Sequence, residues 1–93
     1  MVMENINSLT KSDRKLILKL LQLEEASTYT LAKLTEMSYA SMFISIRKLE
    51  SMNLVAKLRE VESRKRGRKI IYGLTQRGRE VARSLMNNLW RNG

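Results

Sequence analysis

The sequence predicts a mainly α-helical domain with a small β-hairpin, of the α+β class, and three observations carry this prediction. An apolar stripe of helical spacing runs through residues 39–52. A shorter helical segment stands a few residues ahead of it. Two β-prone runs follow, joined by a basic segment that contains Gly67, which permits a tight hairpin turn. Two helices, a short turn and a hairpin predict a winged helix-turn-helix.

The central predicted helix begins after Ser38, whose hydroxyl can accept a free backbone N–H as an N-cap. It ends before Asn53, where a helix often needs a left-handed residue and Asn is tolerated in place of Gly. Its inward stripe, at i, i+4 and i+7, consists of Met42, Ile46 and Leu49. We interpret this helix as the recognition helix of the helix-turn-helix.

The other face of this helix combines small, polar and a few bulky residues. Such a face suits the DNA major groove, where hydroxyls can meet base edges and methyls or rings can meet thymine. Tyr39 and Ser41 could also be ordinary polar residues of a helix. Phe43 and Ile44 could equally be buried by folding or by contact with a partner subunit. The candidate DNA-binding residues here are Ser38, Tyr39, Ala40, Ser41, Phe43, Ile44, Arg47 and Lys48.

The remaining elements follow from local patterns. A wide apolar stripe predicts a helix at about 11–24, with Thr10 as the cap and Asp13 in a capping box. A second helix is expected at about 30–36, with Leu31 and Leu34 inward, preceded by a short strand at 27–29. The wing is expected at about 54–74, with strands at 54–61 and 69–74. Thr75 is expected to cap a C-terminal helix at about 76–92.

Composition limits the classes of function. Ninety-three residues predict one domain, and the formal charge is +9. Residues 1–46 are neutral overall, so the whole excess lies in the second half of the chain. This asymmetry favours a polyanionic partner, with nucleic acid ahead of an anionic membrane surface.

No catalytic constellation is apparent. The chain has no His and no Cys, which removes the common nucleophile–base pairs, disulfides and the usual zinc ligands. Its four glycines form no phosphate-binding loop. We therefore expect no enzyme, no cofactor and no metal. With no signal peptide and no apolar run long enough to span a bilayer, we expect no membrane partner and a cytoplasmic location.

The segment between the two predicted strands concentrates positive charge. A charge run is usually a solvated face, but here it is confined to a hairpin tip, where like charges repel one another. Contact with DNA phosphates or the minor groove explains the concentration better. The candidate wing contacts are Arg64, Lys65, Arg66, Arg68 and Lys69.

Four phrases together resemble the winged-helix core of MarR-like transcription regulators. They are Leu31-Ala-Lys-Leu34, Leu49-Glu-Ser-Met-Asn-Leu-Val55, Arg68-Lys-Ile-Ile-Tyr-Gly-Leu-Thr75 and Leu74-Thr-Gln-Arg-Gly-Arg-Glu80. Their order and spacing are more specific than any single phrase, and the match covers roughly Leu16 to Leu85. The resemblance implies a winged helix that binds DNA, with Arg68 as the best single contact. In size the chain also resembles the small winged-helix regulators of crenarchaeal viruses and their hosts, and for a viral protein the expected location is the host cytoplasm.

Three positions depart from the family pattern. Asn53 stands where the family usually has Gly. Arg66 stands near the position where the family usually has an acidic residue that pairs with the wing arginine. The resemblance therefore supplies no acid–arginine pair to brace the wing of this chain. Ile44 stands where a polar or basic DNA-contacting residue is common.

The apolar stripe of the last predicted helix is long for so small a core. Part of it is expected to pack on the first helix and part on a second subunit, and the alternative is that it only closes the monomer. The predicted homodimer interface consists of Val81, Leu85, Met86, Leu89 and Trp90.

The leading functional interpretation is sequence-specific binding of double-stranded DNA by a homodimeric transcription regulator. A winged helix that binds another protein is an alternative, although a weaker basic wing would then be expected. RNA binding is another, but it favours more stacking aromatics than the 5% in this chain.

Overall fold

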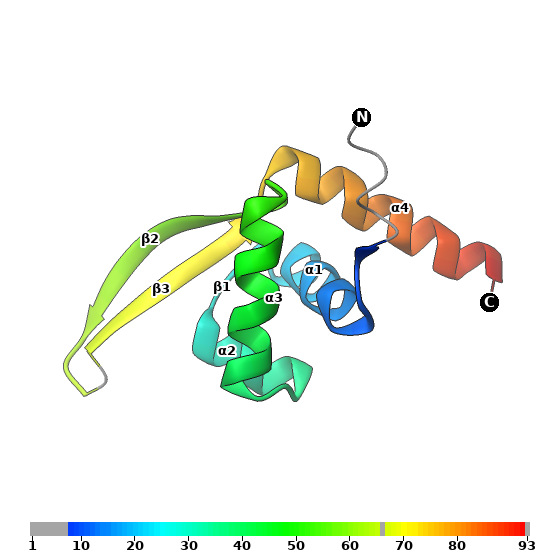
Figure 1. Ribbon diagram of the computed structural model, residues 1–93. Helices are drawn as coiled ribbons and strands as arrows, with labels where there is room; N and C mark the ends of the chain where they lie inside the picture. Colours follow the sequence, from blue (N-terminus) through cyan, green and yellow to red (C-terminus); the bar gives the residue numbers. More distant parts are fainter. Residues whose placement is uncertain (1–7, 66, 93) are drawn as a thin grey trace.

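The computed structural model describes the backbone of residues 8–65 and 67–92, with all their side chains except those of Ser63 and residues 88–92. The first three helices pack together in the body of the domain, a hairpin extends from one side, and the last helix runs toward the other (Figure 1). The elements in chain order are α1 (Lys11–Leu23), β1 (Glu25–Ser27), α2 (Thr28–Thr35), α3 (Tyr39–Ser51), β2 (Val55–Ser63), β3 (Gly67–Leu74) and α4 (Gln76–Asn92). This architecture confirms the predicted winged helix-turn-helix.

Two elements differ from their predicted positions. The strand expected at 27–29 is β1, two residues earlier, and the helix expected at about 30–36 is α2, which begins at Thr28. The reason is the Ser27 hydroxyl, which accepts a hydrogen bond from the Thr30 backbone N–H at 3.2 Å and so caps the helix sooner. Leu34, expected to point inward, is 46% exposed.

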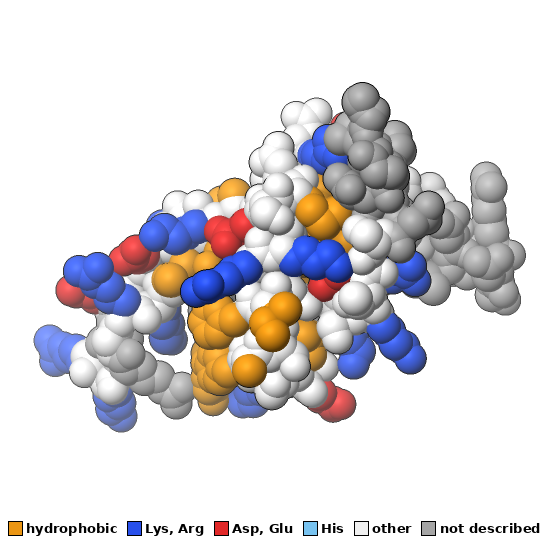
Figure 2. Space-filling model, in the orientation of Figure 1, with side chains coloured by type: hydrophobic (Ala, Val, Ile, Leu, Met, Phe, Trp, Pro, Cys, Tyr) orange, Lys and Arg blue, Asp and Glu red, His pale blue; other side chains and the backbone are white. Residues whose placement is uncertain are grey.

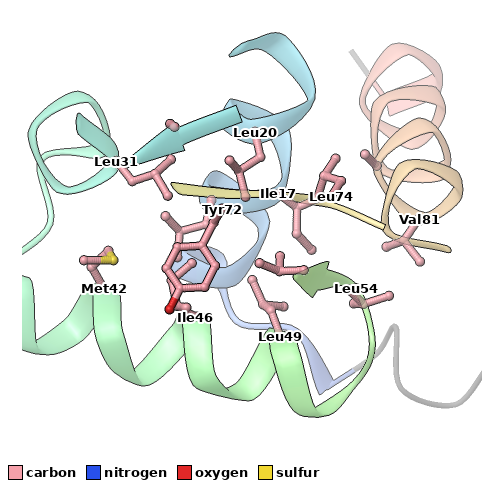
Figure 3. Close-up of a cluster of buried hydrophobic side chains, with 14 of the residues drawn as sticks. Ile17, Leu20, Leu31, Met42, Ile46, Leu49, Leu54, Tyr72, Leu74 and Val81 are labelled. Carbon is pink, nitrogen blue, oxygen red and sulfur yellow. The ribbon is translucent and has the colours of Figure 1, made fainter. Parts of the chain in front are cut away.

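The core lies where α1, α2, α3, β3 and α4 meet (Figure 3). The predicted α3 stripe is confirmed, because Met42, Ile46 and Leu49 are fully buried. From α1 and α2 the core receives the fully buried Leu16, Ile17, Leu20 and Leu31. Burial of such side chains contributes about 1.5–3 kcal/mol each, so this cluster fixes how α3 sits on α1.

The three-stranded antiparallel sheet has the order β1-β3-β2. Only its base covers the core: Tyr72 and Leu74 of β3 are buried, whereas Gly67, Arg68 and Lys69 are exposed. The outer half of the β2–β3 hairpin therefore projects from the domain (Figure 1). A register shift between Lys57 and Arg59 marks a bulge on the way to this projecting part.

The end of α3 is connected tightly to the start of α4. Asn53 has a φ of 62°, which confirms the predicted left-handed residue, and the N–H of Leu54 donates to the carbonyl of Leu49 at 2.9 Å. The Thr75 hydroxyl donates to the Asn53 carbonyl at 2.7 Å and accepts from the Gly78 N–H at 2.9 Å, so Thr75 caps α4 as predicted. This junction sets the angle at which the last helix leaves the sheet.

Among the helices that the structure describes, none has the length and apolar character needed to cross a membrane.

Candidate nucleic-acid interface

The helix-turn-helix is formed by α2, the three-residue turn at 36–38 and α3. Glu36 has a φ of 58°, and the N–H of Met37 donates to the Ala32 carbonyl at 3.1 Å, which closes the end of α2. The Ser38 hydroxyl accepts the N–H of Ser41 at 3.1 Å, as its predicted capping role requires. These caps hold α3 across the front of the domain, with one face on the core and the other open.

The open face of α3 begins with bulky side chains. Ile44 is 70% exposed, Tyr39 47% and Phe43 37%. The rings of Tyr39 and Phe43 stack with centroids 5.9 Å apart, so each limits the freedom of the other. Figure 2 shows hydrophobic side chains over the lower half of α3 with Lys and Arg side chains beside them. The exposed predicted contacts on this helix are Ser38, Tyr39, Ala40, Ser41, Phe43, Ile44 and Arg47.

Lys48 differs from the other predicted contacts on α3. Its ammonium lies 2.8 Å from a carboxylate oxygen of Asp13 and donates to the Ser8 carbonyl at 2.7 Å. The same Asp13 oxygen accepts the N–H of Thr10 at 2.9 Å in the capping box of α1. The structure therefore gives Lys48 an internal partner at the start of α1 rather than leaving it open to a ligand.

Ion pairs along the hairpin stiffen its base and middle. Glu60 on β2 accepts from Lys57 at 2.7 Å and from Arg68 on β3 at 3.3 Å. The hydrogen bond and charge of Lys57, and to a lesser degree those of Arg68, lower the pKa of the Glu60 carboxyl. Because Arg68 is paired by register with Glu62, its contact with Glu60 is a diagonal cross-strand pair. A bracing acid–arginine pair is thus present, although not the one that the family pattern would place.

A second brace spans the whole sheet. Arg59 on β2 reaches over β3 to Glu25 on β1, and one of its two hydrogen bonds to the carboxylate is 3.0 Å long. Gly73 pairs with Glu25 and Ile71 pairs with both Ser27 and Arg59, so the two charged residues flank the same stretch of β3. The Arg59 hydrogen bond and charge lower the pKa of the Glu25 carboxyl. The hairpin base is held to the body of the domain at this point.

The tip of the hairpin keeps cations available for a ligand. Among the described residues, no ion pair or hydrogen bond engages the exposed side chains of Arg64, Lys65 and Lys69. Arg68 is 71% exposed even with its contact to Glu60. The predicted contact Arg66 lies outside the described residues. In Figure 2, Lys and Arg side chains lie along the hairpin to the left of α3, with Asp and Glu side chains among them.

The predicted dimer residues divide between core and surface. Val81 and Leu85 are only 9% and 8% exposed because α4 packs them against the core, in which α1 takes part. Met86 is 41% exposed. The side chains of Leu89 and Trp90 lie outside those that the structure describes. The first part of the apolar stripe closes the monomer, and Met86 is its described member that remains open.

Sequence reasoning missed the residues that position the interface. The sequence predicts only a helix-capping role for Asp13, and no pattern links it to Lys48, 35 residues away. Arg59 and Glu25 were not singled out at all. Alternation along β2 could have placed Arg59 on one face of a strand, but the bulge beside it alters that register.

No protein-family model matches the chain, and no curated protein matches it by sequence. Solved structures do match its fold. ZitR of Lactococcus lactis, a zinc-responsive MarR family member, aligns with a TM-score of 0.74 at 16% identity, over 98% of this chain and 66% of its own. The transcriptional regulator PA4135 aligns with a TM-score of 0.77 at 26% identity, over 95% of this chain and 62% of its own. The adhesin competence repressor AdcR of Streptococcus pyogenes aligns with a TM-score of 0.72 at 19% identity, over 92% and 61%.

The fold is the winged helix of MarR-family regulators. The expected resemblance to that family is confirmed in the fold, and the structural relatives include a transcriptional regulator, a repressor and a zinc-responsive MarR family member. The chain spans 61% to 66% of the length of these three relatives. None of them tests the resemblance to regulators of crenarchaeal viruses.

Proposed function

We propose that this chain binds double-stranded DNA as a transcription regulator, with the open face of α3 in the major groove and the hairpin tip against the backbone. The proposal depends mainly on one observation: a helix with exposed, mixed side chains lies beside a projecting hairpin. At the hairpin tip, the cations of Arg64, Lys65 and Lys69 have no partner among the described residues, and Arg68 is 71% exposed. A helix fits the major groove, and Lys and Arg side chains bind phosphates by releasing condensed counterions.

Within this proposal the residues have different roles. Tyr39, Ser41 and Arg47 offer polar groups to base edges, while Arg64 and Lys69 bind phosphates. Lys48 is a positioning residue, because its ammonium holds α3 to the start of α1. The two ion-pair braces join β2 to β1 and to β3, and so support the hairpin from which the tip projects.

We further propose that the regulator acts as a homodimer. A two-fold dimer places two recognition helices about 34 Å apart, one turn of B-DNA, and so reads a palindromic site. Met86 of α4 is the described residue suited to this contact, since it is an exposed apolar side chain on the helix that leaves the domain. Met86→Glu should shift the sedimentation coefficient from dimer to monomer, whereas Leu85→Asp would also disturb the core.

The proposal is tested by competition. A labelled duplex chosen by the protein from a random-sequence pool is challenged with unlabelled duplex DNA, single-stranded DNA and double-stranded RNA. We expect only duplex DNA to compete efficiently, because an A-form RNA major groove is too narrow for α3. Equal competition by RNA, or no binding to any nucleic acid, would leave an RNA-binding or protein-binding winged helix as the better account.

A further inference from the structure

We propose that α3 selects its DNA site through the C5 methyl groups of pyrimidines in the major groove, with Ala40, Phe43 and Ile44 as the contacting side chains. Thymine is the common source of this methyl group, and 5-methylcytosine presents the same group at the same place. This inference rests on the proposed function and adds the chemistry by which the helix tells one sequence from another.

The first two turns of α3 lack the side chains that read bases by paired hydrogen bonds. Bidentate recognition of guanine uses Arg or Lys, and that of adenine uses Asn or Gln. None of these four residue types occurs between Ser38 and Ile46, and the first is Arg47 in the third turn. Of the hydroxyls in this part, Ser38 caps the helix and Ser45 is buried. Hydrogen bonding at the leading end of α3 is left to Tyr39 and Ser41.

What this end of the helix does present is apolar. Ala40 and Ile44 stand four residues apart on one line of the open face, and Phe43 lies beside them. Ile44 is 70% exposed, the most exposed of the large apolar side chains that the structure describes. The stack between Tyr39 and Phe43, with ring centroids 5.9 Å apart, restricts the Phe43 ring before any ligand arrives. An apolar face that is already ordered suits contact with a rigid methyl group.

The surroundings of this face favour DNA over an apolar protein as its occupant. Arg47 lies one turn beyond Ile44 on the same side of α3, and the cationic hairpin tip lies to the side of the helix (Figure 2). The second half of the chain carries the whole +9 charge. A polyanion that offers isolated apolar groups between its phosphates meets both requirements, and the duplex major groove with its C5 methyls is such a surface.

The experiment removes the methyl groups and nothing else. A duplex that wild-type protein has selected from a random pool is resynthesised with deoxyuridine replacing thymine, one position at a time, which preserves base pairing and every phosphate. Burying one methyl group is expected to change the dissociation constant about fourfold, so deoxyuridine at a contacted position should weaken binding about fourfold. At the same position, C·G is then compared with 5-methylcytosine·G, which differ only in the C5 methyl group, and the methylated pair should bind more tightly.

Protein variants then assign the contact. In Ile44→Ala and Phe43→Ala the ratio of thymine to deoxyuridine affinity should fall toward one, because the methyl group has lost its partner. Val61→Ala is the matched control: Val61 is a 40% exposed aliphatic residue on β2, away from α3, and its removal should leave the ratio unchanged. Thermal melting of each variant confirms that it folds.

The outcomes separate the two claims. Tight duplex binding with equal affinity for thymine and deoxyuridine at every position would overturn the methyl inference and leave the proposed function standing. If the wild type prefers thymine to deoxyuridine, and both Ile44→Ala and Phe43→Ala keep that preference, the methyl inference would also be overturned. A protein that binds no duplex at all would overturn the proposed function and the inference together.

Discussion

The ammonium of Lys48 in α3 lies 2.8 Å from the carboxylate of Asp13 in α1, and the Asp13 side chain is only 2% exposed. The same carboxylate accepts the N–H of Thr10, so one buried group both caps α1 and binds α3. Because α1 contributes the centre of the core, this contact fixes the base of the recognition helix relative to the rest of the domain. The position of the candidate DNA-binding face of α3 thus depends on an ion pair that lies outside that face.

Removing the cation of this pair should destabilise the fold. Lys48→Met keeps the length of the side chain but leaves the Asp13 carboxylate without its ionic partner, which is expected to lower the free energy of unfolding by about 1–3 kcal/mol. Urea denaturation followed by circular dichroism measures the change. Lys33→Met, at an exposed lysine of α2, is the control and should have little effect. An equal loss of unfolding free energy in both variants would show that the Lys48–Asp13 ion pair does not itself stabilise the fold.

Acid should weaken the fold through the same residue. Burial raises the pKa of Asp13, but the hydrogen bonds from Lys48, Thr10 and Ser45 and the charge of Lys48 outweigh burial and lower the pKa below its usual value. A lowered pKa in the folded state stabilises the fold above the unfolded pKa of about 3.9, and this contribution is lost as the pH falls through the folded pKa. Wild type should therefore lose stability below about pH 4 more steeply than Asp13→Asn, as unfolding at several pH values can measure. Parallel pH profiles would contradict this assignment.

Gly78 should not tolerate a side chain. A Cβ at this position would lie 2.0 Å from the Leu54 carbonyl oxygen, a backbone atom that also accepts the N–H of Thr75 at 3.0 Å. Gly78→Ala is expected to lower the free energy of unfolding by about 1–3 kcal/mol, because α4 must move away from the α3–β2 junction. Ser84→Ala, at an exposed position of the same helix, is the control and should be nearly neutral. Thermal melts of the two variants and the wild type measure these changes, and equal melting temperatures for Gly78→Ala and Ser84→Ala would contradict the prediction.

The hairpin tip should carry the salt dependence of DNA binding. Replacing Arg64 and Lys69 by Ala removes two proposed phosphate contacts and should reduce the slope of log affinity against log salt by about one unit per side chain. The loss should be similar for preferred and random duplexes. Arg83→Ala, an exposed arginine on α4, should leave the slope unchanged. If the substitutions at Arg64 and Lys69 leave the slope of log affinity against log salt unchanged, these hairpin side chains do not contact DNA phosphates.

Sequence patterns predicted the helices well because their signals are local. The stripe through Met42, Ile46 and Leu49, the caps at Thr10 and Ser38 and the left-handed Asn53 depend only on residues a few positions apart. The earlier start of α2 was missed because Ser27 can either extend a strand or cap a helix, and β-propensity alone does not separate the two.

The contacts between elements were not predictable in the same way. The pairs Lys48–Asp13 and Arg59–Glu25 join residues 35 and 34 positions apart, and their spacing carries no periodic signal. Burial of Val81 and Leu85 likewise depends on how closely α4 approaches α1, which the stripe on α4 leaves open. The sequence therefore indicated candidate contact residues, and the tertiary structure decided which of them remain exposed.

The most direct test of the account is a titration of ¹⁵N-labelled protein with a selected DNA duplex, followed by nuclear magnetic resonance. We expect the largest amide shifts in residues 39–47 of α3 and 64–69 of the hairpin. We expect small shifts at the exposed α4 positions Arg83, Ser84 and Asn87. A duplex that binds tightly while shifting α4 and leaving α3 unchanged would contradict the central claim that α3 and the hairpin form the DNA interface.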